Sequence, residues 1–188
     1  MSREDTLVLK AVVLYILKNS TSSMKHSVYH LVKTAFLAQQ KHLAKYLCPM
    51  FNDRIVALQF GPVPSDIYNA LKIARGDDKA RSFNLNEHLH LVYDAVAFDE
   101  EAFEALEEPD LDYLFDASVE CLDEALRQVS EMSFEKILNV THKGEWLRAY
   151  ENPVDKTMNY IAIAEEGGAD EASLAYLKES MDVDAMLK

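Results

Sequence analysis

The chain has 188 residues, the size of one domain with at most an appended tail, and 49% of them are hydrophobic, which excludes a globally disordered chain. Its net charge of −13 disfavours direct binding to nucleic acid, because phosphates repel an acidic protein. Its two cysteines cannot build a disulfide framework, and no apolar run reaches the ~20 residues of a membrane-spanning helix. We therefore expect a cytoplasmic protein without membrane association.

The charges are unevenly distributed along the chain. Residues 1–82 hold 12 Lys and Arg against 6 Asp and Glu, whereas residues 83–188 hold 7 against 26. One interpretation is that the basic half packs against the acidic half, or that both are solvated faces. The other is that the charged surface serves a protein partner, because complementary charge governs the association rate and the choice of partner.

The first half of the chain predicts two helices and a short apolar segment. Residues 7–18 are apolar almost all round, as in a buried helix, although their Val and Ile content also permits a buried strand. Apolar residues recur at helical spacing over residues 24–46, and the Cys48-Pro49 pair ends that helix because a residue before proline avoids the helical region. Residues 54–60 then form a strand or a tight helical turn.

Residues 61–65 read Gly-Pro-Val-Pro-Ser and predict a rigid, extended bend, because the two prolines fix their own φ and remove two backbone donors. Ser65 is well placed to cap a following helix, Asp66 suits its first turn, and Gly76 can end it. The bend either orients two core elements or presents a binding surface, since a rigid loop loses less entropy on binding.

The second half begins with an alternating pattern. Residues 88–97 alternate with period two, which predicts a strand, and residues 101–106 form either its hairpin partner or a helix. Asp116 and Ser133 are expected to cap two further helices, with Trp146 just beyond the second.

The last part of the chain, Glu171–Met186, reads as an amphipathic helix reached through a flexible glycine pair. The fold class is therefore α+β and predominantly helical, a single compact domain with a small antiparallel β element. We assign residues 1–152 to the domain and residues 153–188 to an acidic extension packed on it.

The sequence holds only weak signals for metal binding or catalysis. His26 and His30 are four residues apart, and His88 and His90 would share one face of a strand, but no third metal ligand is evident. Cys48 lies near a helix end, where the dipole opposes a thiolate. We therefore expect no enzyme, no cofactor and no metal, with a metal-dependent enzyme that uses these histidines as the rival hypothesis.

Two stretches of the sequence carry a resemblance to a known family. The first combines residues 31–39 and His42 with the motif at 56–65 and Tyr68. The second runs from residues 121–125 to Thr141-His142, with Trp146 after it. Together they resemble the Panacea domain, also called the SocA-like antitoxin domain.

The resemblance spans roughly residues 7–150 and implies a function that is not enzymatic. Such a domain binds and neutralises a protein toxin encoded alongside it. Alternatives are an adaptor that delivers the toxin to an ATP-dependent protease and a phage-associated regulator that binds a host protein. Phe60 stands where a tyrosine is frequent in the family. The partner-binding residues implied by motif position are Lys33, His42, Phe60, Gly61, Pro62, Val63, Pro64, Ser65, Tyr68, His142 and Trp146.

Overall fold

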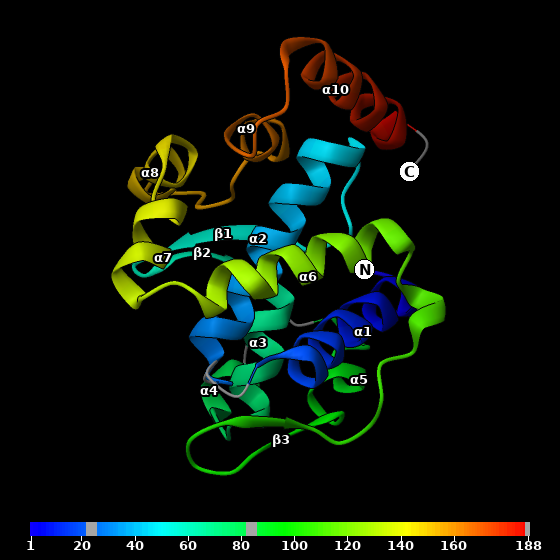
Figure 1. The fold of residues 1–188 in the computed structure, drawn as a ribbon, viewed down its shortest axis with the longest axis vertical. Coiled ribbons are helices and arrows are strands. Elements are labelled where there is room, and N and C mark those ends of the chain that lie inside the picture. The colour runs from blue at the N-terminus through cyan, green and yellow to red at the C-terminus, as the bar shows by residue number, and fades with distance from the viewer. Residues whose placement is uncertain (22–25, 82–85, 187–188) are drawn as a thin grey trace.

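A long central helix, α2 (Val28–Tyr46), organises the molecule (Figure 1). The computed structural model describes residues 1–21, 26–81 and 86–186. Most of α2 is buried, because it packs against helices on several sides. The Ser27 side chain caps it by accepting a hydrogen bond from the His30 amide at 3.4 Å. The predicted helix is confirmed from Val28 to Tyr46; residues 24 and 25 lie outside the described part of the chain, and His26 and Ser27 precede the helix.

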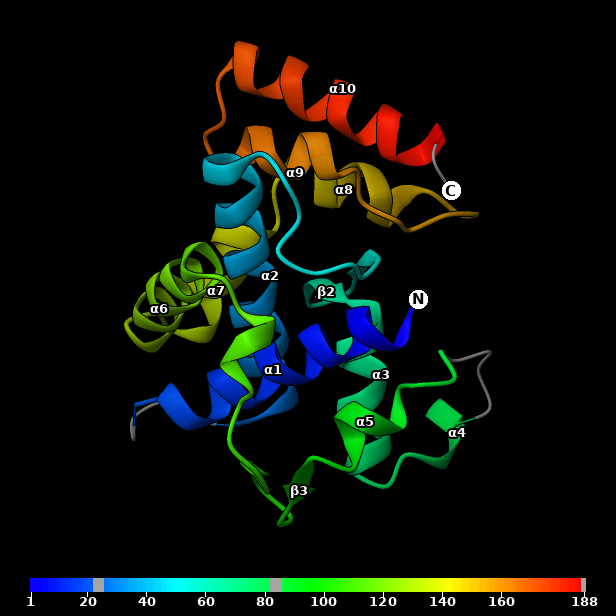
Figure 2. The same cartoon turned by 90° about the vertical axis from the view of Figure 1, so that its right-hand side faces the viewer.

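Helix α1 (Arg3–Asn19) crosses the lower half of α2 (Figure 2). It begins with a capping box, in which the Ser2 hydroxyl accepts from the Asp5 amide and the Asp5 carboxylate accepts from the Ser2 amide. Burial of nearly every residue from Leu9 to Leu17 explains why its sequence is apolar all round. The helix prediction is confirmed, and the strand alternative is wrong.

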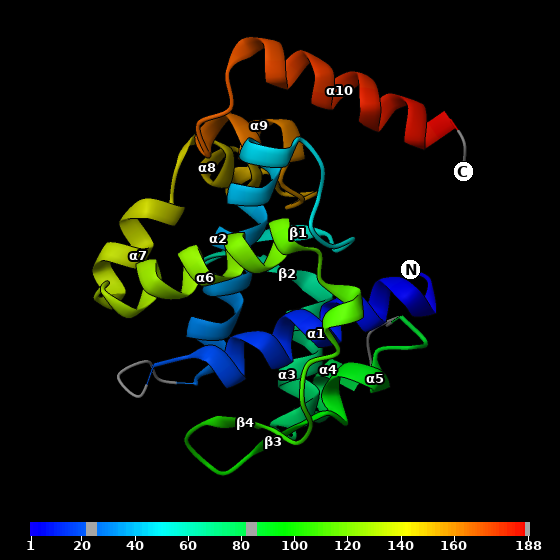
Figure 3. The same cartoon turned by 45° about the vertical axis from the view of Figure 1, so that its right-hand side comes forward.

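The other elements are arranged around these two helices. They are α3 (Ser65–Ala74), α4 (Asp78–Arg81), α5 (His90–Tyr93), η1 (Leu111–Tyr113), α6 (Asp116–Ser130), α7 (Phe134–Thr141), α8 (Gly144–Glu151), α9 (Tyr160–Glu166) and α10 (Glu171–Met186). Helix α6 crosses α2 and leads into α7 (Figure 3). The structure is 61% helical, so the predicted helix-rich α+β class is confirmed.

Two antiparallel hairpins supply the β structure. Strand β1 (Ile55–Leu58) pairs with β2 (Gly61–Pro64), and β3 (Val96–Phe98) pairs with β4 (Phe103–Ala105). Within residues 54–60, Ile55–Leu58 are thus a strand rather than a helical turn, and within residues 101–106, Phe103–Ala105 return as a hairpin partner.

The strand predicted over residues 88–97 is wrong for most of its length. Helix α5 occupies its middle, and a strand begins only at Val96. Leu89 and Val92 are both buried and three residues apart, so one face of a short helix packs against α1 and α3. His88 and His90 therefore do not share the face of a strand.

Two of the expected helix caps are also wrong. Pro64 is the N-cap residue of α3, and Ser65 is its first helical residue. The Asp53 carboxylate caps α3 instead, accepting from the Asp66 amide at 3.0 Å and the Ile67 amide at 3.2 Å.

At α6, Phe115 rather than Asp116 is the N-cap residue, and Asp116 lies in the first turn, where the helix dipole favours a carboxylate. At α7, the expected cap is confirmed, because the Ser133 hydroxyl accepts from the Lys136 amide.

The chain after residue 152 packs on the rest of the molecule. Residues 156–158 run along the free side of β1, where Ala57 donates to Lys156 O and Met158 donates to Ile55 O, both at 2.9 Å. Helix α9, which the sequence analysis did not foresee, packs on α2. Helix α10 lies across α9 at the end of the molecule opposite β3 (Figure 2).

Ion pairs join the basic first half to the acidic second half, as the first interpretation of the charge distribution expects. The pairs are Lys10–Glu107 (2.8 Å), Lys18–Glu108 (2.6 Å), Lys41–Glu124 (3.5 Å) and Lys45–Glu120 (3.0 Å). Within the described ranges, every helix is too short or too polar to cross a lipid bilayer.

Candidate functional site

The β1–β2 hairpin turns at Gln59 and Phe60 and closes at Gly61, whose φ is +95°. A positive φ after a two-residue turn is typical of hairpins that close through a glycine bulge. Packing gives a second reason for glycine. A Cβ atom at this position would lie 2.9 Å from Lys33 Nζ and 3.0 Å from both His142 Nε2 and Thr141 Oγ1. The turn is therefore pressed against side chains from α2 and the end of α7.

Side chains from distant elements also hold the hairpin carbonyls. The Trp146 indole Nε1 donates to Leu58 O at 3.0 Å, and Lys33 Nζ donates to Pro62 O at 2.6 Å. These bonds fix the backbone on both sides of the turn, one from α8 and one from α2. The entropic cost of ordering the turn when a partner binds is therefore small, because the turn is already fixed in the free protein.

An aromatic stack supports the turn from the side of α8. The His142 and Trp146 rings are parallel with centroids 3.8 Å apart, and the Trp146 and Tyr150 rings lie 4.9 Å apart at 13°. Trp146 and Tyr150 are four residues apart on α8 and so share a face. His142 ends α7, which brings the predicted histidine–tryptophan pair to the hairpin.

The Lys33 amine is enclosed beneath the hairpin, and the residue is only 1% exposed. Burial lowers the pKa of Lys33 to about 7. Burial also lowers the pKa of His142, and the nearby Lys33 charge lowers it further, while a hydrogen bond to the Phe60 backbone opposes the shift. Lys33 thus acts on the hairpin from inside and does not offer its amine to solvent.

The prolines of β2 lie at alternate positions with a common orientation. Ser65 donates to Arg54 O, and Val63 lies opposite Val56, so the amides of Ser65 and Val63 face β1. The nitrogens of Pro62 and Pro64 consequently point to the outer side of the strand. Proline carries no N–H, so no donor is lost there.

An exposed aromatic cluster surrounds the turn. Phe60 is 55% exposed and Phe134 is 47% exposed, with ring centroids 6.2 Å apart, and Phe134 lies 4.7 Å from the Tyr29 ring. Beside this cluster a pocket of about 560 Å³ opens between the start of α2, the hairpin and the end of α3. We call it the hairpin pocket; Lys33 and Arg75 are among its lining residues.

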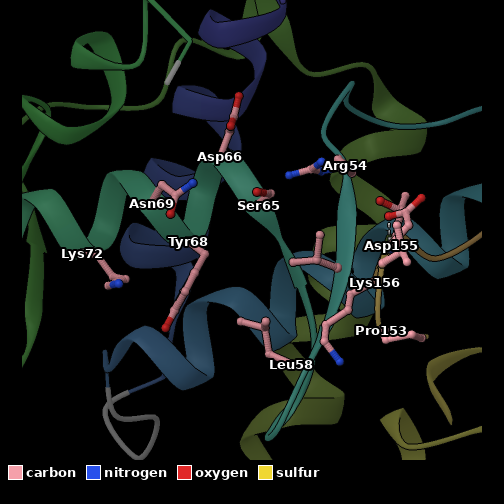
Figure 4. A pocket seen from close by; sticks show the side chains of 13 residues that line it. Arg54, Leu58, Ser65, Asp66, Tyr68, Asn69, Lys72, Pro153, Asp155 and Lys156 are labelled. Carbon is pink, nitrogen blue, oxygen red and sulfur yellow. Dashed lines mark hydrogen bonds between the residues drawn. The ribbon is translucent and has the colours of Figure 1, made fainter. Parts of the chain in front are cut away.

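A second pocket of about 600 Å³ lies on the other side of Tyr68, between β1, the start of α3 and residues 153–157 (Figure 4). Leu58 and Tyr68 line both pockets, so the two hollows form one continuous surface. The charged residues of the second pocket are Arg54, Asp66, Lys72, Asp155 and Lys156.

The part of the chain that builds this surface matches a family model. The model of the antitoxin SocA-like, Panacea domain matches residues 31–147, which is more than half of the chain. The chain belongs to the Panacea domain family. This confirms the resemblance found in the sequence, and the family name supports an antitoxin role with a protein partner. Comparisons with curated proteins and with solved structures give no match.

Most of the motif residues of this Panacea domain meet at the hairpin, but their exposure differs. Phe60 is exposed, and four others are half-buried: Ser65, Tyr68, His142 and Trp146. The buried ones are Lys33, Gly61, Pro62, Val63 and Pro64, which shape the hairpin.

His42 is not part of this assembly. It is buried near the end of α2, where its Nδ1 lies 2.8 Å from Cys48 O and its ring 5.1 Å from that of Tyr46. Burial lowers the pKa of His42, while the hydrogen bond to Cys48 raises it.

Sequence reasoning missed Tyr29, Arg75 and Phe134. Phe134 follows a correctly predicted cap, and it is exposed beside Phe60. Its position directly after the cap, ahead of the buried Ile137, is the signal that separates it from the core face.

The histidines considered as metal ligands serve local structure. His26 Nδ1 lies 3.0 Å from Phe103 O, and His30 Nδ1 lies 2.9 Å from Ser27 Oγ. Across residues 1–21, 26–81 and 86–186, no group of three His, Cys, Asp or Glu residues could hold a metal ion. Burial raises the pKa of Cys48, which disfavours a thiolate.

Proposed function

We propose that this Panacea domain is the antitoxin of a toxin–antitoxin pair and neutralises a cognate protein toxin by stoichiometric binding, without catalysing a reaction. The observation that carries the proposal is the exposed Phe60 at the tip of a hairpin whose backbone is held by Trp146 and Lys33. Large aromatic side chains on rigid supports are typical energetic centres of protein interfaces.

The surface around the hairpin has room for such an interface. Tight protein complexes bury about 1,200–2,000 Å² in total. The two pockets beside Tyr68 and the aromatic cluster of Phe60 and Phe134 form a contiguous hollowed surface. Binding here would place the partner against residues that the family motif positions.

The proposal is tested by co-expression with the product of the adjacent open reading frame. That product is induced alone and together with this chain, growth is recorded, and the two proteins are co-purified. Growth arrest by the neighbour, rescue by this chain and co-elution of both support direct neutralisation. A harmless neighbour, or rescue without a complex, overturns it.

Two phenylalanine variants locate the contact. Phe60→Ala should weaken the complex by about tenfold or more, because it removes the aromatic anchor. Phe115→Ala is the control, since Phe115 is 81% exposed. Phe115 directly precedes α6, whose length of about 22 Å separates it from α7. Equal effects of the two changes would contradict a role for the hairpin tip.

The same strains separate neutralisation from delivery to a protease. Direct neutralisation rescues growth whether or not ATP-dependent proteases are present. If a protease-deficient strain loses the rescue and shows a longer toxin half-life, the result contradicts direct neutralisation and supports the adaptor function instead.

A further inference from the structure

The hairpin pocket joins apolar walls to positive charge. Val28 and Val32 of α2 and Val63 of β2 line its apolar part, while Lys33 and Arg75 are its charged residues. No carboxylate lines it, although the whole chain has 32 acidic residues against 19 basic ones. The charged side chains of the pocket lining are therefore basic, whereas the net charge of the whole protein is negative.

Arg75 supplies the accessible part of this charge. It is exposed at the C-terminal cap of α3, and its guanidinium makes no ion pair with any residue that the structure describes. The nearby Lys72, by contrast, pairs with Asp77 at 3.1 Å. The Arg75 guanidinium can therefore bind a carboxylate without first breaking an existing pair.

Two further residues, Tyr29 and Lys33, line the pocket but keep their polar atoms buried. The Tyr29 hydroxyl is buried and has no hydrogen-bond partner within the described residues. Burial raises the pKa of Tyr29 to about 12, so its hydroxyl remains a donor at neutral pH. The Lys33 amine donates to Pro62 O and is shielded from solvent, so Arg75 is the basic group of this lining that a partner can reach.

We propose that the hairpin pocket binds an acidic segment of the protein partner, with an aromatic or large aliphatic side chain between the valines and a neighbouring carboxylate against the exposed Arg75 guanidinium. The inference rests on the proposed function, because it names the chemistry of the toxin surface that is recognised. Three valines form walls that suit a side chain better than a phosphate backbone, and the chain's net charge of −13 opposes nucleic acid.

The first test uses the complex with the adjacent gene product. Arg75→Glu should weaken it about tenfold or more, mainly through a slower association rate with a reduced salt dependence. Val28→Trp, which fills the apolar part from the first turn of α2, should weaken it to a similar extent through faster dissociation.

Lys178→Glu is the matched control for Arg75→Glu. It makes the same change in charge on an exposed residue of α10, which lines neither pocket, and should alter affinity less than about twofold. Thermal unfolding of each variant shows whether the fold is retained. Wild-type affinity in both folded pocket variants overturns the inference and leaves the proposed function standing.

A second test needs no partner. 3-Phenylpropanoate and 2-phenylethylamine carry the same ring with opposite charges, and each is titrated into the isolated chain while backbone amide shifts are recorded by NMR. The carboxylate should shift amides of the hairpin pocket, the amine should not, and Arg75→Glu should remove the response. Equal responses to both probes, or shifts scattered over the surface, overturn the assignment. Selective binding of the carboxylate together with no toxin complex would refute the proposed function alone.

Discussion

The two hairpins of this molecule have the same secondary structure but are stabilised differently. In β1–β2, the carbonyls beside the turn accept bonds from Trp146 and Lys33, which lie far away in the sequence. In β3–β4, the turn closes on itself, because Asp99 and Ala102 bond each other. The positive φ is taken by glycine in the first turn and by Glu100, at +78°, in the second.

This difference shows where rigidity comes from in a hairpin too short to be stable alone. A two-stranded hairpin is marginal in water, so its tip is only as fixed as its surroundings make it. Side chains from α2, α7 and α8 surround the first turn, whereas the second turn lies at an exposed end of the molecule. The first hairpin is therefore suited to present a contact residue.

The largest expected effect concerns the buried amine beneath the first hairpin. The pKa of Lys33 is about 7 in the folded protein and about 10.4 for an exposed lysine, so the unfolded chain binds more protons between these values. The free energy of unfolding should therefore rise from pH 7 to pH 10, by up to about 4 kcal/mol. Lys33→Met should lack this rise in urea unfolding followed by circular dichroism.

Other titrating groups are common to both proteins, so the difference between their pH profiles isolates the contribution of Lys33. Parallel profiles for the wild type and Lys33→Met would show that the amine is not buried as described. The variant also leaves Pro62 O without its donor, which lowers its stability by a similar amount at each pH.

An intermediate effect is expected from substituting the positive-φ residue in the turn of each hairpin. Gly61→Ala should lower the free energy of unfolding by about 3 kcal/mol, because it adds backbone strain and a Cβ atom 2.9 Å from Lys33 Nζ. Glu100→Gly should change it by less than about 1 kcal/mol, towards greater stability, because glycine accepts a positive φ. Urea unfolding at one pH measures both, and equal losses would erase the contrast between the hairpins.

The smallest effect is expected at the indole hydrogen bond. Trp146→Phe keeps a ring against His142 but removes the donor to Leu58 O, at a cost of about 1 kcal/mol. Circular dichroism is the suitable probe, since Trp146 is the only tryptophan. Tyr150→Phe, which preserves the stack and removes only a hydroxyl, serves as the control and should stay within about 0.5 kcal/mol of wild type.

The sequence predicts what depends on local pattern. The spacing of apolar residues in α2 and the cap at Ser133 are local features, and the structure agrees with both. The glycine–proline motif is extended as predicted, but Gly61–Pro64 form the paired strand β2 rather than a bend. The alternation over residues 88–97 misleads, because tertiary contacts with α1 and α3 favour the helical face formed by Leu89 and Val92.

The parts that could not be predicted depend on residues distant in sequence. Asp53 caps α3 from 13 positions before Asp66, and the Tyr160 hydroxyl in turn donates to the Asp53 carbonyl. Lys33 looks like a surface residue of an amphipathic helix until the hairpin lies over it. Only the three-dimensional arrangement therefore divides the motif into buried supports and one exposed contact.

The outward-facing prolines of β2 have a consequence for how any partner can approach. Pro62 and Pro64 offer no amide to a further strand, and residues 156–158 already occupy the side of β1. Neither side of this small sheet can template β-sheet growth, whether by a second copy of the chain or by an extended segment of a foreign protein. Recognition at the hairpin must then depend on side chains, so a few surface substitutions could redirect the protein to another target while its backbone stayed the same.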